Sequence, residues 1–564
     1  MKVSFLQELE TGKDYTNEDI ISLILKTRDL KEPLTSFLKP KNPLSISLAD
    51  WGLAAEIKKT LEILAGVRQR GGTIVVYTDY DADGITGGSI LWETLHSLDF
   101  KVMPYVPHRQ TEGYGFSIAG INAIKEKYDP SLIISVDHGI TAREQVRYAA
   151  SLGMPVIITD HHLKPAELPD AAEAIFHVPE LSGSGVAYFF AKMCFEHFGG
   201  QVSKMRRDLL DYYFAHDYLS LASIGTLADL VPLNGASRSV VKYGLAAFSQ
   251  MRRVGMQEIL REAGIEGKRI TPYEIGFIIA PRINAIGRLE HAIDALRLLC
   301  TRDTKRAAEL ASKVAQTNRD RQALVTQAVN EAVAQVESNY GSELPAIITL
   351  TSDHWHEGII GLISSRITEK YNRPTIVITK GDGKHKGSAR SIGDFHITDF
   401  LRSLREHLID VGGHKGAAGF SIEGKKLAAF QQKVSEISNT QFTTIDLEKS
   451  ITADLKLPIS RVSLSLAKAL EELEPFGIGN QKPIFYSHAQ VLGADLFGKR
   501  KEHLKLYVKD PQVSSFPFEL VQFSGASLKP ELARGRQLDI VFNGEIDRWT
   551  GTEKLRGRLI HAIV

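Results

Sequence analysis

Three carboxylates stand at alternate positions directly after a short β-branched stretch of the chain. The stretch is TIVVYT (73–78), and Asp79, Asp81 and Asp83 follow it in the sequence DYDADG. Because neighbouring anions repel one another, this spacing favours a bound cation. An EF-hand calcium loop would carry glutamate at its twelfth position, where Ile90 stands, and would follow a helix instead of a predicted strand. The EF-hand is therefore excluded, and a solvated acidic turn is the competing interpretation of this motif alone.

Two further predicted strands deliver metal-type ligands in the same way. SLIISVD ends at Asp137, and PVIITD ends at Asp160, which His161 and His162 follow. The carboxyl ends of parallel strands meet at one edge of a sheet, and open α/β sheets place their sites there. Carboxylates and imidazoles without thiolates suit Mn²⁺ or Mg²⁺ better than structural zinc. Carboxylates that bridge two such ions are usual in phosphoryl chemistry, so the pattern predicts a two-metal site.

The elements that must position these residues alternate between strand and helix from about residue 73. Runs that are apolar throughout, separated by helical or loop segments, are typical of a parallel sheet covered on both faces. A helical region is expected from 208 to 300. Three prolines are expected to interrupt it: Pro232, Pro272 and Pro281. Residues 302–340 contain neither proline nor glycine, and they predict one long, mostly polar helix that bridges two domains.

A second α/β unit and a β-rich tail complete the chain. The apolar runs PAIITL and PTIVITK enclose an amphipathic stretch, which indicates another strand–helix–strand arrangement. From about residue 450, short strand-like runs dominate and predict a small all-β barrel or sandwich. The expected fold class is therefore α/β: a parallel-sheet domain joined by a long helix to a second α/β domain, plus a C-terminal all-β domain.

The composition is that of an ordinary soluble, multi-domain protein. At roughly 150 residues per domain, 564 residues suggest about three to four domains. Lys+Arg 68 against Asp+Glu 67 gives a net charge of +1, which argues against polybasic binding, although an acidic metal site can cancel a basic groove in the total. The two cysteines, Cys194 and Cys300, suggest a reducing compartment. We expect a cytoplasmic protein, because no signal peptide and no membrane-spanning run is predicted.

With these motifs in view, the chain resembles the DHH phosphoesterase family, and within it the RecJ type of single-strand-specific 5′→3′ DNA exonuclease. The resemblance covers residues 55–564. The motifs that carry it are DYDADG (79–84), PHRQTEGYG (107–115), VDHG (136–139), DHH (160–162), GTLADLVPL (225–233), PRINAIGRL (281–289), HWHEGIIGLISSRI (354–367), KGSARS (386–391), GGHKGAAG (412–419) and EPFGIGNQKPIF (474–485). One departure is His138, where the family more often shows Asn or Cys.

The resemblance implies a division of the chain into domains. The expected parts are an N-terminal segment (1–55), a DHH catalytic domain (56–235), a helical region with the long connecting helix (236–340), a DHHA1-like substrate-binding domain (341–445) and an OB-fold (450–564). The role of the N-terminal segment does not follow from its sequence.

The resemblance also implies roles for the acidic residues. Asp81 and Asp83 each serve one of two divalent cations, Mn²⁺ or Mg²⁺, and Asp137 bridges the two ions. Asp79 either binds the first ion or only shapes the loop. The implied reaction is hydrolysis of a phosphodiester, in which the ions activate a water molecule and offset charge on the phosphate.

The histidines and the fourth motif complete this set. His161 and Asp229 are implied as further ligands of the second ion. His162 is implied beside the reacting phosphate, and Asp160 is implied to orient both histidines. Asp229 is identified through the family alone, since an aspartate that ends an apolar helix is usually a cap or a surface residue.

Contacts with a single strand are implied for residues of both α/β units. Arg109, Arg282 and Arg390, with Ser388, are the candidates for gripping a terminal 5′-phosphate, which carries more charge than an internal one. Tyr114 is either a base-stacking residue or a loop aromatic that packs on the surface. The other candidate contacts are His354, Ser391, Gly413 and His414.

The function implied is metal-dependent 5′→3′ degradation of single-stranded DNA in recombination and repair. The expected partners are single-stranded DNA and, by resemblance, a single-strand-binding protein and a helicase, with no membrane. Two alternatives stay open. A related hydrolase of short oligonucleotides or cyclic dinucleotides would need no strand-holding barrel. An inactive single-strand-binding replication scaffold should have lost metal ligands, whereas every expected position is filled here.

Overall fold

The computed structural model describes residues 2–10, 13–28, 30, 32–109, 112–113, 115–381, 383–441, 449–513, 517–548 and 551–563. The chain divides into two compact units. The larger contains Val3–Ile283, Ala292–Ala308 and the chain from Ser450, and the smaller contains Asn284–His291 and Glu309–Lys449. Among the described residues, no helix combines the length and the apolar character needed to cross a membrane.

A parallel sheet lies at the centre of the larger unit. Its strands, in spatial order, are β3 (Val102–Tyr105), β2 (Ile74–Thr78), β4 (Leu132–Val136), β5 (Val156–Asp160) and β6 (Ala174–His177). Each neighbouring pair is parallel. β2, β4 and β5 are buried along their whole length, as their continuous apolar runs predict. The chain places β3 on one side of β2 and β4 on the other, so the strand order reverses there, which creates a crevice at the carboxyl ends.

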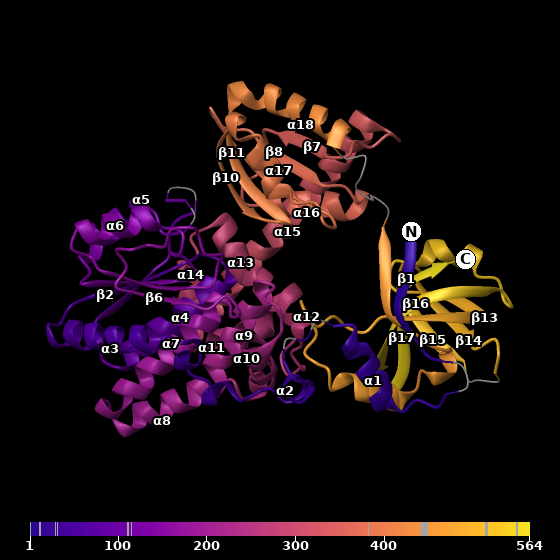
Figure 1. Cartoon of the computed structure of the whole chain (residues 1–564), viewed down its shortest axis with the longest axis horizontal. Coiled ribbons are helices and arrows are strands. Elements are labelled where there is room, and N and C mark those ends of the chain that lie inside the picture. The colour runs from indigo at the N-terminus through magenta and orange to yellow at the C-terminus, as the bar shows by residue number, and fades with distance from the viewer. Residues whose placement is uncertain are drawn as a thin grey trace. The chain divides into compact units, whose positions relative to one another are not determined.

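Helices cover both faces of this sheet (Figure 1). On one face lie α3 (Ala54–Gln69), α4 (Ala82–Ser97), α7 (Gly183–Phe198) and α9 (Tyr218–Ala228). On the other lie α5 (Ile118–Tyr128) and α6 (Arg143–Ser151), whose apolar side chains share a core with Val75, Ile133 and Ile158. The predicted parallel sheet with two covered faces is confirmed.

The helical region continues the larger unit. Its further helices are α8 (Lys204–Tyr212), α10 (Gly235–Ala247), α11 (Val254–Glu262), α12 (Pro272–Glu274), α13 (Ala280–Leu289) and α14 (Ile293–Cys300), with π-helical turns at Tyr213–Asp217 and Ile275–Ile279. The exception is Asn284–His291, which include the second half of α13 and belong to the smaller unit. Pro232 separates α9 from α10, and Pro272 begins α12. The expectation that Pro281 interrupts the region was wrong, because it lies in the first turn of α13. The π-helical turn before it widens the helix, with the Ala280 N–H donating to the Ile275 carbonyl, and so accommodates a residue that has no N–H.

The long helix predicted for 302–340 is present as α15 (Thr304–Tyr340), which has 37 residues. The smaller unit holds a mixed sheet in the order β10 (Leu408–His414), β11 (Ala417–Glu423), β9 (Lys384–Arg390), β8 (Thr375–Thr379) and β7 (Ile348–Ser352). β7 and β8 are parallel, and the other pairs are antiparallel. α16 (Ile360–Tyr371) packs with α15 on one face, and α17 (Ile397–Ser403) and α18 (Leu427–Gln441) pack on the other.

The tail forms the predicted all-β barrel. Its strands are β12 (Ser450–Lys456), β13 (Phe485–Phe497), β14 (His503–Lys509), β15 (Phe518–Gln522), β16 (Gln537–Asp547) and β17 (Lys554–Ile563). β13 pairs with both β14 and β16, which closes the sheet into a barrel. A short helix, α19 (Leu464–Glu471), packs against it.

The N-terminal segment, whose role the sequence left open, belongs to this barrel. β1 (Lys2–Glu8) lies beside β12, and the indigo strand is seen among the yellow ones in Figure 1. Ile20 and Ile24 of α1 (Asn17–Lys26) are buried in the barrel's core together with Phe37 of α2 (Leu34–Leu38). The two ends of the chain thus build one hydrophobic core.

A buried arginine joins the helical region to the segment that precedes β13. Arg238 of α10 donates from Nε to the Phe37 carbonyl and from Nη1 to the Pro475 carbonyl. Its Nη2 donates to the carbonyls of Leu473 and Glu474. Four main-chain acceptors therefore surround this fully buried guanidinium, which satisfies a charge that burial would otherwise penalise.

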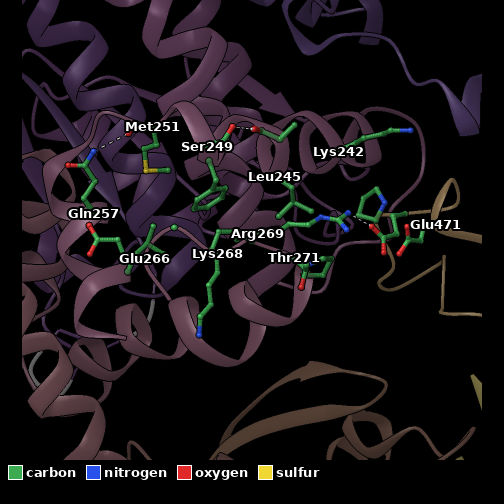
Figure 2. Close-up of a pocket in the computed structure, with 18 of the residues that line it drawn as sticks. Lys242, Leu245, Ser249, Met251, Gln257, Glu266, Lys268, Arg269, Thr271 and Glu471 are labelled. Carbon is green, nitrogen blue, oxygen red and sulfur yellow. Dashed lines mark hydrogen bonds and ion pairs between the residues drawn. The ribbon is translucent and has the colours of Figure 1, made fainter. Parts of the chain in front are cut away.

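A cavity of about 920 Å³ lies next to this junction (Figure 2). Apolar side chains such as Leu245 and Met251 line it together with charged ones. Several of the charged groups are engaged within the chain: Arg269 pairs with Glu474, and Lys242 donates to the Leu38 carbonyl. None of the lining residues belongs to the acidic motifs of the sequence.

Candidate metal centre

The acidic motifs meet at the crevice where the strand order of the parallel sheet reverses. Asp79 and Asp81 follow β2, Asp137 follows β4, and Asp160 ends β5. Asp83 lies in the first turn of α4, and Asp229 caps the carboxyl end of α9. The structure thus brings together residues from separate motifs, as the sequence predicts.

Three groups of these side chains have ligand atoms close enough to share an ion. Within each group, the ligand atoms lie within 4.8 Å of one another. The groups are Asp79, Asp81 and Asp137; Asp83, His161 and Asp229; and Asp137, His161 and His162. Asp137 therefore stands in a group with the DYDADG residues and in another with the histidines, which is the placement that a residue shared between two ions requires.

Two buried atoms at the centre of the cluster support a cation. Asp137 Oδ1 and His161 Nε2 are buried and have no hydrogen-bonding partner among the described residues. They lie 3.2 Å apart, and Nε2 is 3.4 Å from an oxygen of Asp229. Leaving such atoms unsatisfied costs about 1–3 kcal/mol each. A divalent cation would satisfy both, and carboxylate and imidazole donors fit Mn²⁺ or Mg²⁺.

The backbone and the electrostatics of the cluster point the same way. Asp137 adopts φ = 67°, a left-handed conformation that is unusual outside glycine and that is found preferentially at functional sites. Burial and the neighbouring carboxylates raise the pKa of Asp81 and Asp137, and they raise that of Asp229 to about 8. Burial lowers the pKa of His161, which favours the neutral imidazole that binds metals. Such mutual repulsion is relieved when cations bind.

Asp160 holds the histidine loop together. Its Oδ1 accepts hydrogen bonds from the backbone N–H groups of His161 and His162, at 2.7 and 3.1 Å, and lies 2.8 Å from His162 Nδ1. Its Oδ2 accepts from the Ile140 N–H at 2.8 Å. Burial alone would lower the pKa of His162, but the bond to Asp160 raises it to about 9. These hydrogen bonds fix Asp160 against the loop that carries both histidines, and its role in orienting them for the reaction stays a prediction from the resemblance.

We expect Asp160→Ala to loosen this loop and to lower the free energy of unfolding by about 3 kcal/mol, because the backbone and ring donors around it lose a charged acceptor. Thermal melting in a chelator measures the loss without involving bound metal. Asp170→Ala is the matched control, because Asp170 is a half-exposed aspartate that pairs with surface arginines and is expected to cost under about 1 kcal/mol. Equal losses for the two variants would contradict the assigned role.

Close approach of backbone to the carboxylates is essential to the cluster. The two oxygens of Asp83 accept hydrogen bonds from the N–H groups of Gly183 and Ser184, at 2.7 and 2.9 Å, where α7 begins. A Cβ atom on Gly183 would lie 2.4 Å from Asp137 Oδ1, and one on Gly225 would lie 2.1 Å from Asp83 Oδ1. Neither glycine follows from sequence reasoning about ligand types, although the SGSG start of α7 was a signal of tight packing.

One residue beside the site, His177, escaped the sequence analysis, and another, His138, was named there without a role. His177, the last residue of β6, has Nε2 2.6 Å from the His162 carbonyl and so supports the histidine loop from the next strand. His138, the departure from the family pattern, is buried with its ring against Phe116 and Tyr77, at centroid distances of 5.9 and 5.1 Å. The His138 ring, which directly follows Asp137 in the chain, is therefore accommodated by packing against aromatic side chains.

Two residues of the larger unit that were predicted to contact single-stranded DNA, Arg109 and Arg282, lie in different segments of the chain. The Arg109 guanidinium lies 5.2 Å from the ring of Tyr80, within the DYDADG motif. Arg282 of α13 donates from Nη1 to the Ile278 carbonyl at 2.7 Å. Tyr114 lies outside the described residues.

In the smaller unit, Arg390 and Ser388 converge at the start of α16. Arg390 Nη1 donates to Ser388 Oγ at 3.3 Å. A Cβ on Gly361, in the first turn of α16, would lie 3.2 Å from both Arg390 Nη2 and Ser388 Oγ. A guanidinium, a hydroxyl and a helix N-terminus together make a suitable anion site.

The remaining predicted contacts of this unit are placed differently. The Ser391 hydroxyl donates to the Phe395 carbonyl at 2.6 Å, so it is engaged within the chain. Gly413 and His414 end β10, and His354 follows β7. That these four residues contact nucleic acid stays a prediction.

Comparison with known proteins matches three segments of the chain to described families. Residues 73–225 match the DHH family, N-terminal domain; residues 343–440 match the DHHA1 domain; and residues 453–561 match the RecJ OB domain. The single-stranded-DNA-specific exonuclease RecJ of Bacillus subtilis is 32% identical over 551 residues, which are 95% of this chain and 66% of that protein. The protein of the same name from Escherichia coli is 32% identical over 477 residues, 81% of this chain and 82% of its own length.

Solved structures show the same similarity. RecJ of Thermus thermophilus in complex with Mn²⁺ matches all of this chain and 80% of its own, with a TM-score of 0.80 and 26% identity. An exonuclease RecJ bound to manganese matches 70% of this chain and 97% of its own, with a TM-score of 0.58 and 32% identity. The chain therefore spans about two thirds of the Bacillus relative and most of the Escherichia one.

Proposed function

The chain belongs to the RecJ family of single-stranded-DNA-specific exonucleases, and we propose that it is a metal-dependent hydrolase that degrades single-stranded DNA from the 5′ end. The observation that carries the proposal is the carboxylate and histidine cluster at the crevice of the parallel sheet, in which buried Asp137 Oδ1 and His161 Nε2 have no hydrogen-bonding partner among the described residues. An inactive strand-binding scaffold would not need to retain such a destabilising group of anions.

We assign the cluster to two divalent cations, Mn²⁺ or Mg²⁺. Asp79, Asp81 and Asp137 would hold one ion, and Asp83, His161 and Asp229 would hold the other, with Asp137 shared between them. When bound, the ions lower the pKa of the attacking water and offset negative charge on the phosphate.

The chain's own residues position the substrate around that centre. The ring of His162, fixed by Asp160, is assigned a hydrogen bond to the phosphate that reacts. Asp83 accepts hydrogen bonds from two N–H groups at the start of α7. These bonds are proposed to fix the position of its carboxylate relative to the ligands of the other ion. Pre-organised ligands of this kind avoid the cost of rearrangement during the reaction.

The domains of the chain favour long strands over small substrates. A small all-β barrel that matches the RecJ OB domain suits single strands, whereas a dinucleotide hydrolase needs no such domain. Action in recombination and repair, partnership with a single-strand-binding protein and a helicase, the cytoplasmic location and the domain boundaries drawn from the sequence stay predictions from the resemblance.

The experiment that tests the function offers the protein a 5′-labelled long single strand, the matching duplex and a dinucleotide, each with Mn²⁺ and with a chelator. We expect the long single strand to be consumed from its 5′ end and only with metal. Consumption of the dinucleotide alone would support the small-substrate hydrolase, and strand binding without cleavage would support the scaffold.

We propose that Arg390, Ser388 and the start of α16 recognise the terminal 5′-phosphate. Arg390→Ala is then expected to lower kcat/KM for 5′-phosphorylated strands about tenfold or more, since a charged hydrogen bond contributes about 1.5–3 kcal/mol. Strands with a 5′-hydroxyl should lose little. Lys384→Ala, at the other end of β9, is the control. A phosphate preference that survives in the Arg390 variant would place the recognition elsewhere.

A further inference from the structure

Two aromatic side chains stand exposed in the helical run that leads into α13. Tyr273 is 58% exposed and Phe277 is 71% exposed. They lie one helical turn apart, and their rings are stacked, with centroids 4.9 Å apart and planes 28° from parallel. Aromatic surface of this size is expensive to leave in water, so a stacked and exposed pair suggests a ligand that covers it.

The helix holds this pair in place from both sides. Thr271 and Glu274 form a capping box that begins the helix, with Pro272 in its first turn. Ile275 and Ile279 of the following π-helical turn are buried, so the opposite side of the helix is anchored in the core. The backbone that carries the two rings is therefore anchored, and a ligand would meet side chains that project from an ordered helix.

The charges around the pair identify the class of ligand. Between residues 267 and 283 the basic residues Lys268, Arg269 and Arg282 outnumber the single acidic one, Glu274. Glu274 is engaged in capping Thr271, and Arg269 pairs with Glu474. Arg282 lies along the same helix, with its guanidinium at the Ile278 carbonyl, next in sequence to Phe277. Exposed aromatic faces on a stretch whose basic residues outnumber its acidic one match the nucleobases and phosphates of a strand, whereas an apolar protein surface would not need the charge.

We propose that Tyr273 and Phe277 form a stacking platform for the bases of the single-stranded substrate, separate from the metal centre, with Arg282 contacting an adjacent phosphate. This inference rests on the proposed function and adds to it a second grip on the strand. Stacking tolerates any base, so the platform would hold the strand without sequence preference.

The test compares the double variant Tyr273→Ala/Phe277→Ala with Met205→Ala, a control that removes a side chain 78% exposed on α8. Binding of strands that carry 2-aminopurine at successive positions is measured by fluorescence in a chelator, where no cleavage occurs. The platform predicts quenching at particular positions, its loss in the double variant, and an affinity about tenfold weaker than that of the wild type. The variant Phe277→Trp, which keeps an aromatic ring at this position, should retain the quenching and the wild-type affinity.

Catalysis supplies the second readout. With Mn²⁺, the double variant is expected to show about a tenfold higher KM for long strands and an unchanged kcat. Unchanged binding and KM would overturn the inference, as would a change confined to the oligomeric state measured by sedimentation, which would make the pair a protein contact. The binding assay contains no metal and does not depend on catalysis. It would therefore still test the platform if the protein proved not to be a nuclease.

Discussion

Asp137→Asn should abolish Mn²⁺-dependent release of nucleotides while the chain stays folded. The side chain belongs to two of the three ligand groups, and its Oδ1 is buried without a hydrogen-bonding partner among the described residues. Loss of a ligand shared by both ions removes several kcal/mol of transition-state stabilisation, so we expect activity to fall about 1000-fold or more.

The same substitution should separate metal binding from folding. In a chelator, Asp137 is one of several carboxylates that repel one another, so the asparagine variant should melt at the same temperature as the wild type or higher. Mn²⁺ at 100 times its Kd would stabilise the wild type by about 2.7 kcal/mol, and this gain should be largely lost in the variant. Asp208→Asn, at an exposed position of α8, is the control. A folded Asp137 variant with wild-type rates would refute the metal centre.

The second large effect is expected from Gly225→Ala, at a position that carries no chemistry itself. The added Cβ would lie 2.1 Å from both Asp83 Oδ1 and Ser184 Oγ. Alanine favours a helix by about 1 kcal/mol over glycine, but overpacking of a buried site costs about 1–3 kcal/mol and displaces a ligand. A displacement of about 1 Å near a reacting centre costs roughly 100-fold in rate, so we expect a loss of that order.

Gly66→Ala in α3 is the matched control for this effect. Its Cβ would meet only the far end of the flexible Arg70 side chain, at 3.3 Å, so the helix should gain about 1 kcal/mol and the rate should stay unchanged. The measurement is kcat/KM on a long single strand with the melting temperature of both variants. Retention of full activity by the Gly225 variant would show that Asp83 is not held where the structure has it.

Much of the architecture could be predicted because it is local. The runs that became β2, β4 and β5 are rich in valine and isoleucine, which is the composition that burial of both faces of a parallel strand favours. The absence of proline and glycine from 302–340 predicted α15 almost to its ends. Pro281 misled the prediction, because the π-helical turn that accommodates it depends on packing around Ile275 and Ile279, which periodicity does not report.

The residues of the candidate site likewise differ in whether the sequence alone could identify them. The ligand types and their positions at strand ends predicted that Asp79, Asp81, Asp137 and Asp160 would meet. Asp229 needed the family resemblance. Gly183 and Gly225 needed the structure, because their importance lies in the distance to side chains that are more than 40 residues away in the chain.

The sequence by itself indicated the chemistry: carboxylates and imidazoles at the carboxyl ends of neighbouring strands, a combination whose mutual repulsion a bound cation relieves. Only the tertiary structure decided which segments share a core. The N-terminal strand β1 and helix α1 complete the barrel formed by residues beyond 450. The exposed stack of Tyr273 on Phe277 likewise emerged only in three dimensions. The physical reason is that ligand chemistry is a property of residue types, whereas burial and close approach depend on parts of the chain that the local pattern does not connect.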